Sequence, residues 1–132
     1  MKTEKSAGAV IFCENKFLVI RHNKGHWDFS KGHLEVGETE KEAAKREIKE
    51  ETNLDVEFIE GFYEKVEYYP RKGVFKTVVF YLARGCGEVV LQKEELSDYK
   101  WLEFREAKKR LTYESAKELL EKAENFIGLH GL

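Results

Sequence analysis

The chain has 132 residues, 23 of them basic and 25 acidic, and a net charge of −2. This balance excludes binding to nucleic acid or anionic membranes through bulk positive charge. No apolar run approaches the roughly 18 residues of a membrane helix, and residues 1–6 are too polar for a secretory signal. We therefore predict one cytoplasmic domain over residues 1–132, a monomer or dimer, without a membrane partner or a stable nucleic-acid partner.

The two cysteines give no sign of a functional site. Cys13 and Cys86 have neither metal-ligand nor redox-motif spacing. Two thiols in a chain of this size indicate reduced, structural cysteines rather than a disulfide framework.

The first third of the chain predicts a β-hairpin followed by a polar loop. Apolar runs at residues 7–12 and 16–21 flank the turn-like Glu14-Asn15. His22 and His26 follow in a segment that is not a plausible helix, so loop surface is favoured over metal binding there.

Trp27 and Phe29 come just before the glycine-containing segment Ser30-Lys31-Gly32-His33. Aromatic residues beside such a loop usually anchor the core, and they can also form a pocket wall.

The next predicted element is a short helix that ends at residue 52. Thr39 and Glu42 form a capping box at its start, and Asn53 can adopt the left-handed conformation that ends it. Gly32 and Gly37, just upstream, allow tight turns and a close approach of the backbone to a ligand.

One face of this helix carries three glutamates, Glu47, Glu50 and Glu51. Their spacing of i, i+3 and i+4 places the carboxylates close together. Such runs are most often solvated surface, but here the helical phase turns them toward the same side as the apolar residues and away from the lysines. The apolar set is Ala43, Ala44 and Ile48, and the lysines are Lys41, Lys45 and Lys49. Acids that face a fold need compensation, and grouped oxygen ligands suit Mg²⁺ or Mn²⁺.

The second half predicts more strands and then two helices. Strands are expected at residues 55–59, 62–69, 74–83, 88–91 and 99–104, and helices at 105–111 and 112–127, with a cap at Thr112 and a stop at Gly128. This order predicts an α/β (α+β) fold, a mixed sheet with helices on both faces.

The segment 32–54, GHLEVGETEKEAAKREIKEETNL, resembles the signature motif of the Nudix hydrolases. The matching residues are Gly32, Glu38, Arg46-Glu47-Ile48, Glu50-Glu51 and Leu54. Asn53 stands where that family has glycine, and asparagine is the usual second choice for a left-handed cap. The resemblance implies an α/β/α sandwich around a central mixed sheet.

The resemblance also implies roles for the motif residues. Glu47, Glu50 and Glu51 would hold the metal ions, with one of them acting as general base, and Arg46 would orient a neighbouring carboxylate. The backbone carbonyl of Lys31 or Gly32 would join the metal ligands.

A further glutamate from a later loop would complete such a site. The candidates are Glu94 and Glu95, of which we prefer Glu95. A solvated acidic loop is an equally good interpretation of these two residues.

Outside the motif the chain resembles the asymmetric dinucleoside tetraphosphate hydrolases of the animal and archaeal type. The segments that carry this resemblance are Trp27, Lys31-Gly32-His33, Glu60-Gly61-Phe62, Lys76-Thr77-Val78, Phe80-Tyr81-Leu82-Ala83 and Tyr99-Lys100-Trp101-Leu102. One departure is Ser30, where that subfamily tends to have proline.

By this resemblance an adenine would stack between Tyr68 and Phe126. The periodicity of the last helix favours a core position for Phe126 instead. The phosphates would contact Lys31, His33 and Lys76, with Gly32 in the same loop.

Together these features predict a Mg²⁺-dependent (or Mn²⁺-dependent) hydrolase that cleaves diadenosine tetraphosphate to ATP and AMP by water attack on phosphorus. The alternative is a pyrophosphohydrolase for damaged nucleoside triphosphates, ADP-ribose or 5′-triphosphate RNA. A non-catalytic nucleotide-binding module is disfavoured because every carboxylate of the motif is present.

Overall fold

Strand β1 (Lys2–Cys13) lies at the centre of the sheet in a computed structural model that describes residues 1–132. One edge of β1 pairs in parallel with β6 (Val74–Arg84) over nearly its whole length. The other edge is shared by two antiparallel strands: β4 (Ser30–His33) pairs with residues 6–9 in the middle of β1, and β2 (Lys16–His22) pairs at its end. The middle of β1 therefore lies directly beside the glycine-containing segment.

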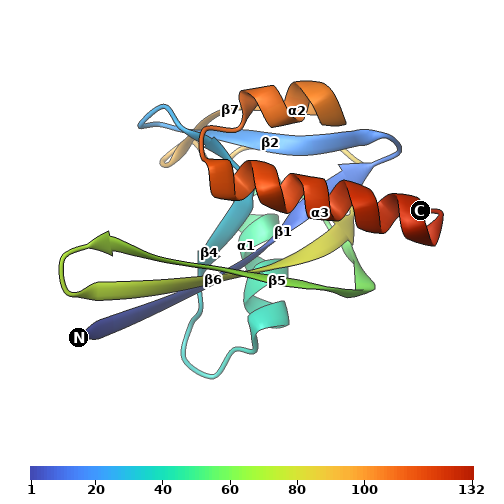
Figure 1. Cartoon of the computed structure of the whole chain (residues 1–132). Helices are drawn as coiled ribbons and strands as arrows, with labels where there is room; N and C mark the ends of the chain where they lie inside the picture. The colour runs from blue at the N-terminus through green and yellow to red at the C-terminus, as the bar shows by residue number, and fades with distance from the viewer.

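The remaining strands extend the sheet on both sides of β1 (Figure 1). They are β3 (Trp27–Asp28), β5 (Glu57–Arg71) and β7 (Leu96–Glu103), and the strand order is β3-β2-β1-β6-β5, with β4 paired to β1 and β7 paired to β2. The long β5–β6 hairpin projects beyond the helices on the side where the N-terminus lies.

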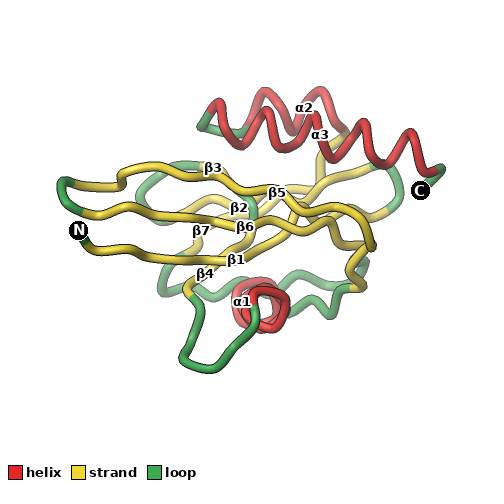
Figure 2. The backbone as a smooth tube through the Cα atoms, turned by 60° about the horizontal axis from the view of Figure 1, so that its bottom comes forward, coloured by secondary structure: helices red, strands yellow, loops and turns green.

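Helices cover both faces of this sheet, as Figure 2 shows with α1 seen end-on. Helix α1 (Glu40–Thr52) lies on one face, and α2 (Phe104–Arg110) and α3 (Glu114–His130) lie on the other. Each interface has its own apolar core: Ile48 of α1 packs into one, and Leu120 of α3 packs into the other. The predicted sandwich with a mixed sheet is thus confirmed. None of the helices combines the length and apolarity that a membrane span requires.

Several predicted strands are confirmed and one is wrong. The hairpin of β1 and β2 forms as expected, and the predicted strands 55–59 and 62–69 join into β5 across an irregularity at Gly61, whose φ is +100°. Residues 88–91 form no strand. Their backbone bonds instead to the end of α1, where the Val90 amide donates to the Thr52 carbonyl at 3.0 Å. The sequence pattern of residues 88–91, which we call the covering segment because it lies over the end of α1, could not be distinguished from that of an edge strand.

The ends of the last helix also differ from the prediction. The N-cap of α3 is Tyr113 rather than Thr112, because the Thr112 hydroxyl accepts a bond from the Trp27 amide at 2.8 Å. The helix continues through Gly128 and ends at Gly131, which adopts the left-handed conformation (φ 64°).

Cys13 and Cys86 form a disulfide, so the predicted pair of reduced thiols is wrong. The register of β1 with β6 sets Phe12 opposite Arg84, which brings the two following segments together. The Cα atoms of the cysteines are 5.2 Å apart, within the range for a bridged pair. The sequence spacing of 73 residues gave no sign of this proximity.

Candidate active site

The start and end of α1 are fixed by its local sequence. The Thr39 hydroxyl accepts from the Glu42 amide at 3.1 Å, and the Glu42 carboxylate accepts from the Thr39 amide at 2.9 Å. Asn53 ends the helix in the left-handed conformation with φ of 69°. The predicted capping box and C-cap are both confirmed, and they set which residues of α1 face the sheet.

The three glutamates of α1 differ in burial. Glu51 is 3% exposed, while the side chains of Glu47 and Glu50 are 17% and 52% exposed. The lysines of α1 are exposed, as the helical phase predicts. The three acids therefore extend from the protein interior to its surface, which we call the rim of the site, and only Glu50 lies largely in solvent.

Glu51 faces strand β4. Its Oε1 accepts a hydrogen bond from the Ser30 hydroxyl at 2.5 Å and another from the Lys31 amide at 3.1 Å. Burial raises the pKa of Glu51 to about 7; the Ser30 hydrogen bond opposes this rise, and the charge of Glu47 adds to it. A carboxyl group with this pKa can exchange a proton near neutral pH.

Arg46 connects the other acids at the rim. Its guanidinium donates to both carboxylate oxygens of Glu38, at 2.6 and 2.9 Å. It also donates to Glu47 at 2.9 Å, to Glu50 at 3.1 Å and to the His33 carbonyl at 2.9 Å. Arg46 thus orients two motif glutamates and holds the end of β4 in place.

Arg46 and burial shift the pKa values of this cluster in opposite directions. Hydrogen bonds from Arg46 lower the pKa of Glu38 to about 2, so Glu38 stays an anion and serves as a structural partner. Burial is the main cause that raises the pKa of Glu47, and the nearby charges of Glu50 and Glu95 add to the rise.

Gly32 is required for the approach of Glu47 to β4. A Cβ atom built on Gly32 would overlap the Glu47 carboxylate. The absence of a side chain therefore lets a carboxylate of α1 lie directly against the backbone that follows Lys31.

The segment before β7 brings a fourth acid toward this cluster. The Gln92 amide donates to the Glu51 carbonyl at 3.1 Å, and the Asn23 amide donates to the Glu95 carbonyl at 2.8 Å. These bonds tie the segment to α1 and to the loop after β2. The charge of Glu95 raises the pKa of Glu47.

The donor set fits a divalent cation in its chemistry. No three acidic, histidine or cysteine side chains converge on one point as ligands, because Arg46 engages Glu47 and Glu50 while Glu51 turns to Ser30. The carboxylates nevertheless raise one another's pKa, so their negative charge is only partly compensated. Clustered carboxylate oxygens with surplus charge are suited to Mg²⁺ or Mn²⁺.

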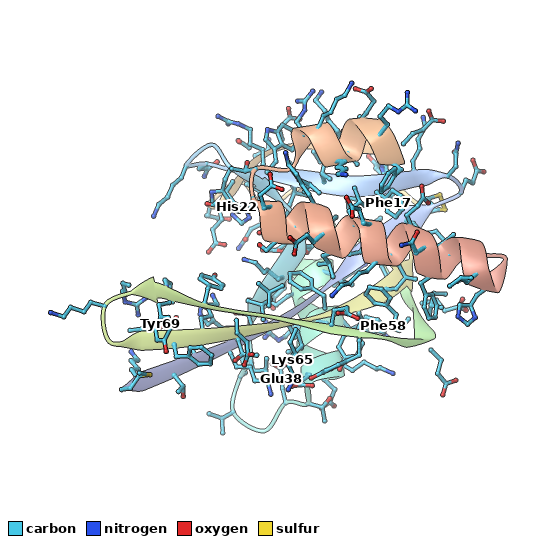
Figure 3. All side chains as sticks on the ribbon, viewed as in Figure 1. Phe17, His22, Glu38, Phe58, Lys65 and Tyr69 are labelled. Atoms are coloured by element: carbon cyan, nitrogen blue, oxygen red, sulfur yellow. A yellow bond between two sulfur atoms is a disulfide. The ribbon has the colours of Figure 1, made fainter.

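A cavity of about 610 Å³ opens on the opposite face of the sheet. One wall is the end of β5 near the turn of the β5–β6 hairpin, and the other is the first turns of α3. Strand β6 forms the floor. Figure 3 labels Tyr69 on the hairpin and His22 near the start of α3. The aromatic and charged lining residues are His26, Asp28, Lys31, Glu67, Tyr68, Tyr69, Phe80, Tyr113 and Glu114.

Of the three predicted phosphate contacts, Lys31 and Lys76 lie near this cavity and His33 does not. Lys31 lines it, and Lys76 is adjacent to Tyr68 in the pairing of β5 with β6. Burial lowers the pKa of Lys76, and the charge of Lys31 lowers it further, so the two ammonium groups lie near each other. His33 is exposed and does not line the cavity; its ring lies 3.9 Å from Glu4.

Phe126 does not line the cavity to which Tyr68 belongs. Its ring packs edge-on against Phe62 at 5.6 Å and stacks on His130 at 4.0 Å, away from the cavity. Tyr113 occupies the cavity wall instead. Sequence reasoning missed Tyr113 because its place depends on how the turn between α2 and α3 docks; its position just before a helix was the only signal.

Comparisons with known proteins agree with this geometry. The profile of the NUDIX domain matches residues 2–123. The chain is 32% identical over 119 residues to the bis(5′-nucleosyl)-tetraphosphatase [asymmetrical] of Rattus norvegicus, covering 85% of this chain and 80% of the relative. It is 34% identical to that of Caenorhabditis elegans, covering 93% of this chain and 96% of the relative. The crystal structure of a C. elegans Ap4A hydrolase binary complex superimposes with a TM-score of 0.86, at 34% identity, over 98% of this chain and 99% of that chain.

Proposed function

The chain belongs to the Nudix family, and from that premise we propose that it hydrolyses diadenosine tetraphosphate asymmetrically, to ATP and AMP. The fold, the carboxylate helix and the identity to asymmetric tetraphosphatases over most of the chain support this substrate.

The observation that carries the proposal is the position of Lys31. Its backbone amide bonds to Glu51 on the α1 side of the sheet, and its side chain lines the aromatic cavity on the α3 side. A single residue of β4 thus joins the acids that perform hydrolysis to a cavity with the aromatic walls that a nucleoside requires. A substrate held in the cavity would have its phosphates directed past Lys31 toward Glu51.

The residues of α1 divide the chemical work. Water attacks a phosphorus near one end of the tetraphosphate, forming one P–O bond as the bond to the leaving phosphate breaks. One of Glu47, Glu50 and Glu51 accepts the proton of that water. Arg46 keeps Glu47 and Glu50 oriented, and Lys31 and Lys76 neutralise phosphate charge.

Glu47, Glu50, Glu51, Glu95 and the Lys31 carbonyl are the groups that would hold Mg²⁺ or Mn²⁺. A bound divalent cation would supply phosphate neutralisation and a lower pKa for its bound water. This ligand set is our proposal for the cofactor of the chain.

The cavity is proposed to hold one adenosine. Tyr68 of β5 and Tyr113, the N-cap of α3, line it and would contact the two faces of the base. Stacking on aromatic side chains is worth about 1–3 kcal/mol per base. A cytoplasmic location and a monomeric or dimeric state remain predictions from the sequence.

Product chromatography tests the proposal. The purified protein is incubated with diadenosine tetraphosphate and Mg²⁺, in parallel with ADP-ribose, 8-oxo-dGTP and a 5′-triphosphate RNA. We expect ATP and AMP in equal amounts from the tetraphosphate, at a higher kcat/KM than for the other substrates.

Two controls make the result specific. EDTA should stop turnover and excess Mg²⁺ should restore it, while Glu51→Gln should stay inactive after Mg²⁺ is restored. Two molecules of ADP as the product, or faster cleavage of another substrate, would contradict the asymmetric assignment.

A further inference from the structure

Asp28 is a buried acid in a cavity that we propose to hold a polyanion. It ends β3, it is 8% exposed and it lines the cavity. Its Oδ1 accepts a hydrogen bond from the Phe29 amide at 2.8 Å. A carboxylate there repels phosphate unless it has another role, and the mechanism above assigns it none.

The second oxygen of Asp28 faces Lys31. The distance from Asp28 Oδ2 to Lys31 Nζ is 3.8 Å, and the two side chains are 12% and 19% exposed. Burial raises the pKa of Asp28, while the charge of Lys31 lowers it. The pair is therefore a partly desolvated ion contact inside the cavity, where attraction between charges is stronger than at the surface.

Lys31 needs such a partner because of its other neighbour. The ammonium of Lys76 lies near enough to Lys31 for repulsion to lower the pKa of Lys76. Asp28 provides the one ion pair of Lys31, whose charge also lowers the pKa of Glu51 through the strand. Glu4 is the acid that acts on Lys76. Without Asp28, repulsion from Lys76 would favour rotamers of Lys31 that leave the cavity for solvent.

We propose that Asp28 is a positioning residue, which holds the Lys31 ammonium in the cavity beside Lys76 so that a nucleoside polyphosphate meets two cations at once. This inference rests on the proposed function only in that the ligand carries a phosphate chain. Asp28 acts through Lys31 and touches no reacting atom.

A double-mutant cycle tests the proposal. ATP binding in the presence of Mg²⁺ is measured by titration calorimetry for the wild type, Asp28→Asn, Lys31→Met and the double variant. We expect Asp28→Asn to weaken ATP binding about fivefold when Lys31 is present and by less than about twofold in the Lys31→Met background. Tighter ATP binding by Asp28→Asn would mean that the acid merely repels phosphate, and it would overturn the proposal.

Glu114→Gln is the matched control, because Glu114 lines the same cavity and pairs with Lys117 rather than Lys31. Its effect on ATP binding should be the same in the wild-type background and in the Lys31→Met background. An equal effect of Asp28→Asn in the two backgrounds would also overturn the proposal.

A second variant and an NMR measurement keep the proposal testable if Asp28→Asn does not fold. Should Asp28→Asn not fold, Asp28→Glu moves the carboxylate by one methylene and should show the same dependence on Lys31. In the free protein, the side-chain ¹⁵N resonance of Lys31 should shift on mutation of Asp28, and an unchanged resonance would contradict the contact. Because ATP binding is measured without turnover, a wrong substrate assignment leaves this cycle interpretable.

Discussion

The acidic face of α1 and the cavity under α3 are built in different ways, although Lys31 joins them. The acids come from one helix, and helical period, a capping box and one arginine set their arrangement. The cavity takes its walls from β3, β4, β5, β6 and α3, so it exists only when the sheet registers and the docking of α3 are right. Under the proposed function, local sequence thus encodes the groups for bond chemistry, and tertiary structure encodes the groups that select the substrate.

The largest expected effect tests the acidic side of this comparison. Glu51→Gln keeps the shape and removes the charge and the titration of a carboxyl group whose pKa is about 7. We expect kcat for the tetraphosphate to fall by roughly 10²–10⁴-fold, with little change in the affinity for adenosine-containing inhibitors. Steady-state kinetics and equilibrium binding check the two parts.

Glu94→Gln is the matched control for that variant. Glu94 neighbours Glu95, and the charge of Glu95 raises the pKa of Glu47. Its kcat should stay within about twofold of wild type, whereas Glu95→Gln should reduce it. Equal losses from Glu94→Gln and Glu95→Gln would show that the acids of this segment act through bulk charge.

The same division explains what the sequence could predict. The limits of α1, the orientation of its lysines and the partnership of Glu38 with Arg46 follow from neighbours in sequence, and the first two were predicted. Tyr113, the bridged Cys13 and Cys86 and the covering segment at 88–91 depend on contacts between distant parts of the chain. Periodicity carries no information about such contacts, so it could indicate the apolar side of α3 but not the residues that line the cavity.

Removal of the disulfide tests whether the arrangement of the acidic residues depends on a covalent link between distant parts of the chain. Cys13 and Cys86 are 73 residues apart, and Cys86 precedes the segment that carries Glu95. Replacing both cysteines by serine should lower the free energy of unfolding by about 2–4 kcal/mol, while kcat/KM at 25 °C changes less than about twofold. Denaturant melts and kinetics on the same samples check this. A large loss of kcat with unchanged stability would mean that the bridge positions Glu95.

A smaller effect tests the cavity side. Tyr113→Leu removes one aromatic wall, and we expect KM for the tetraphosphate to rise about tenfold, as the loss of one base-stacking contact implies. Phe126→Leu is the paired variant: it packs on Phe62 in the core, so it should lower stability by about 1–2 kcal/mol and leave KM unchanged. A raised KM for Phe126→Leu with an unchanged KM for Tyr113→Leu would identify Phe126 as the stacking residue.

The smallest expected effect concerns His22, which lies where the two regions meet. Its ring stacks on that of His26 at 4.2 Å, His26 lines the cavity, and the neighbouring Asn23 amide bonds to the Glu95 carbonyl. Burial, followed by the charge of His26, lowers the pKa of His22 from 6.5 to about 4, and its Nε2 is buried without a partner. The imidazole is therefore neutral in the folded protein at pH values where the unfolded chain already binds a proton.

This difference fixes the sign of the pH dependence. Below 6.5 the unfolded state takes up the proton first, so stability due to His22 is present above that pH and is lost as the pH falls toward 4. Because the ring is partly exposed, we expect a loss of about 1 kcal/mol between about pH 7.5 and about pH 5. His22→Gln should flatten this part of the profile, and His130→Gln, at the exposed end of α3, should not. A profile unchanged by His22→Gln would show that the histidine loop opens to solvent and that burial of His22 does not contribute to the pH dependence.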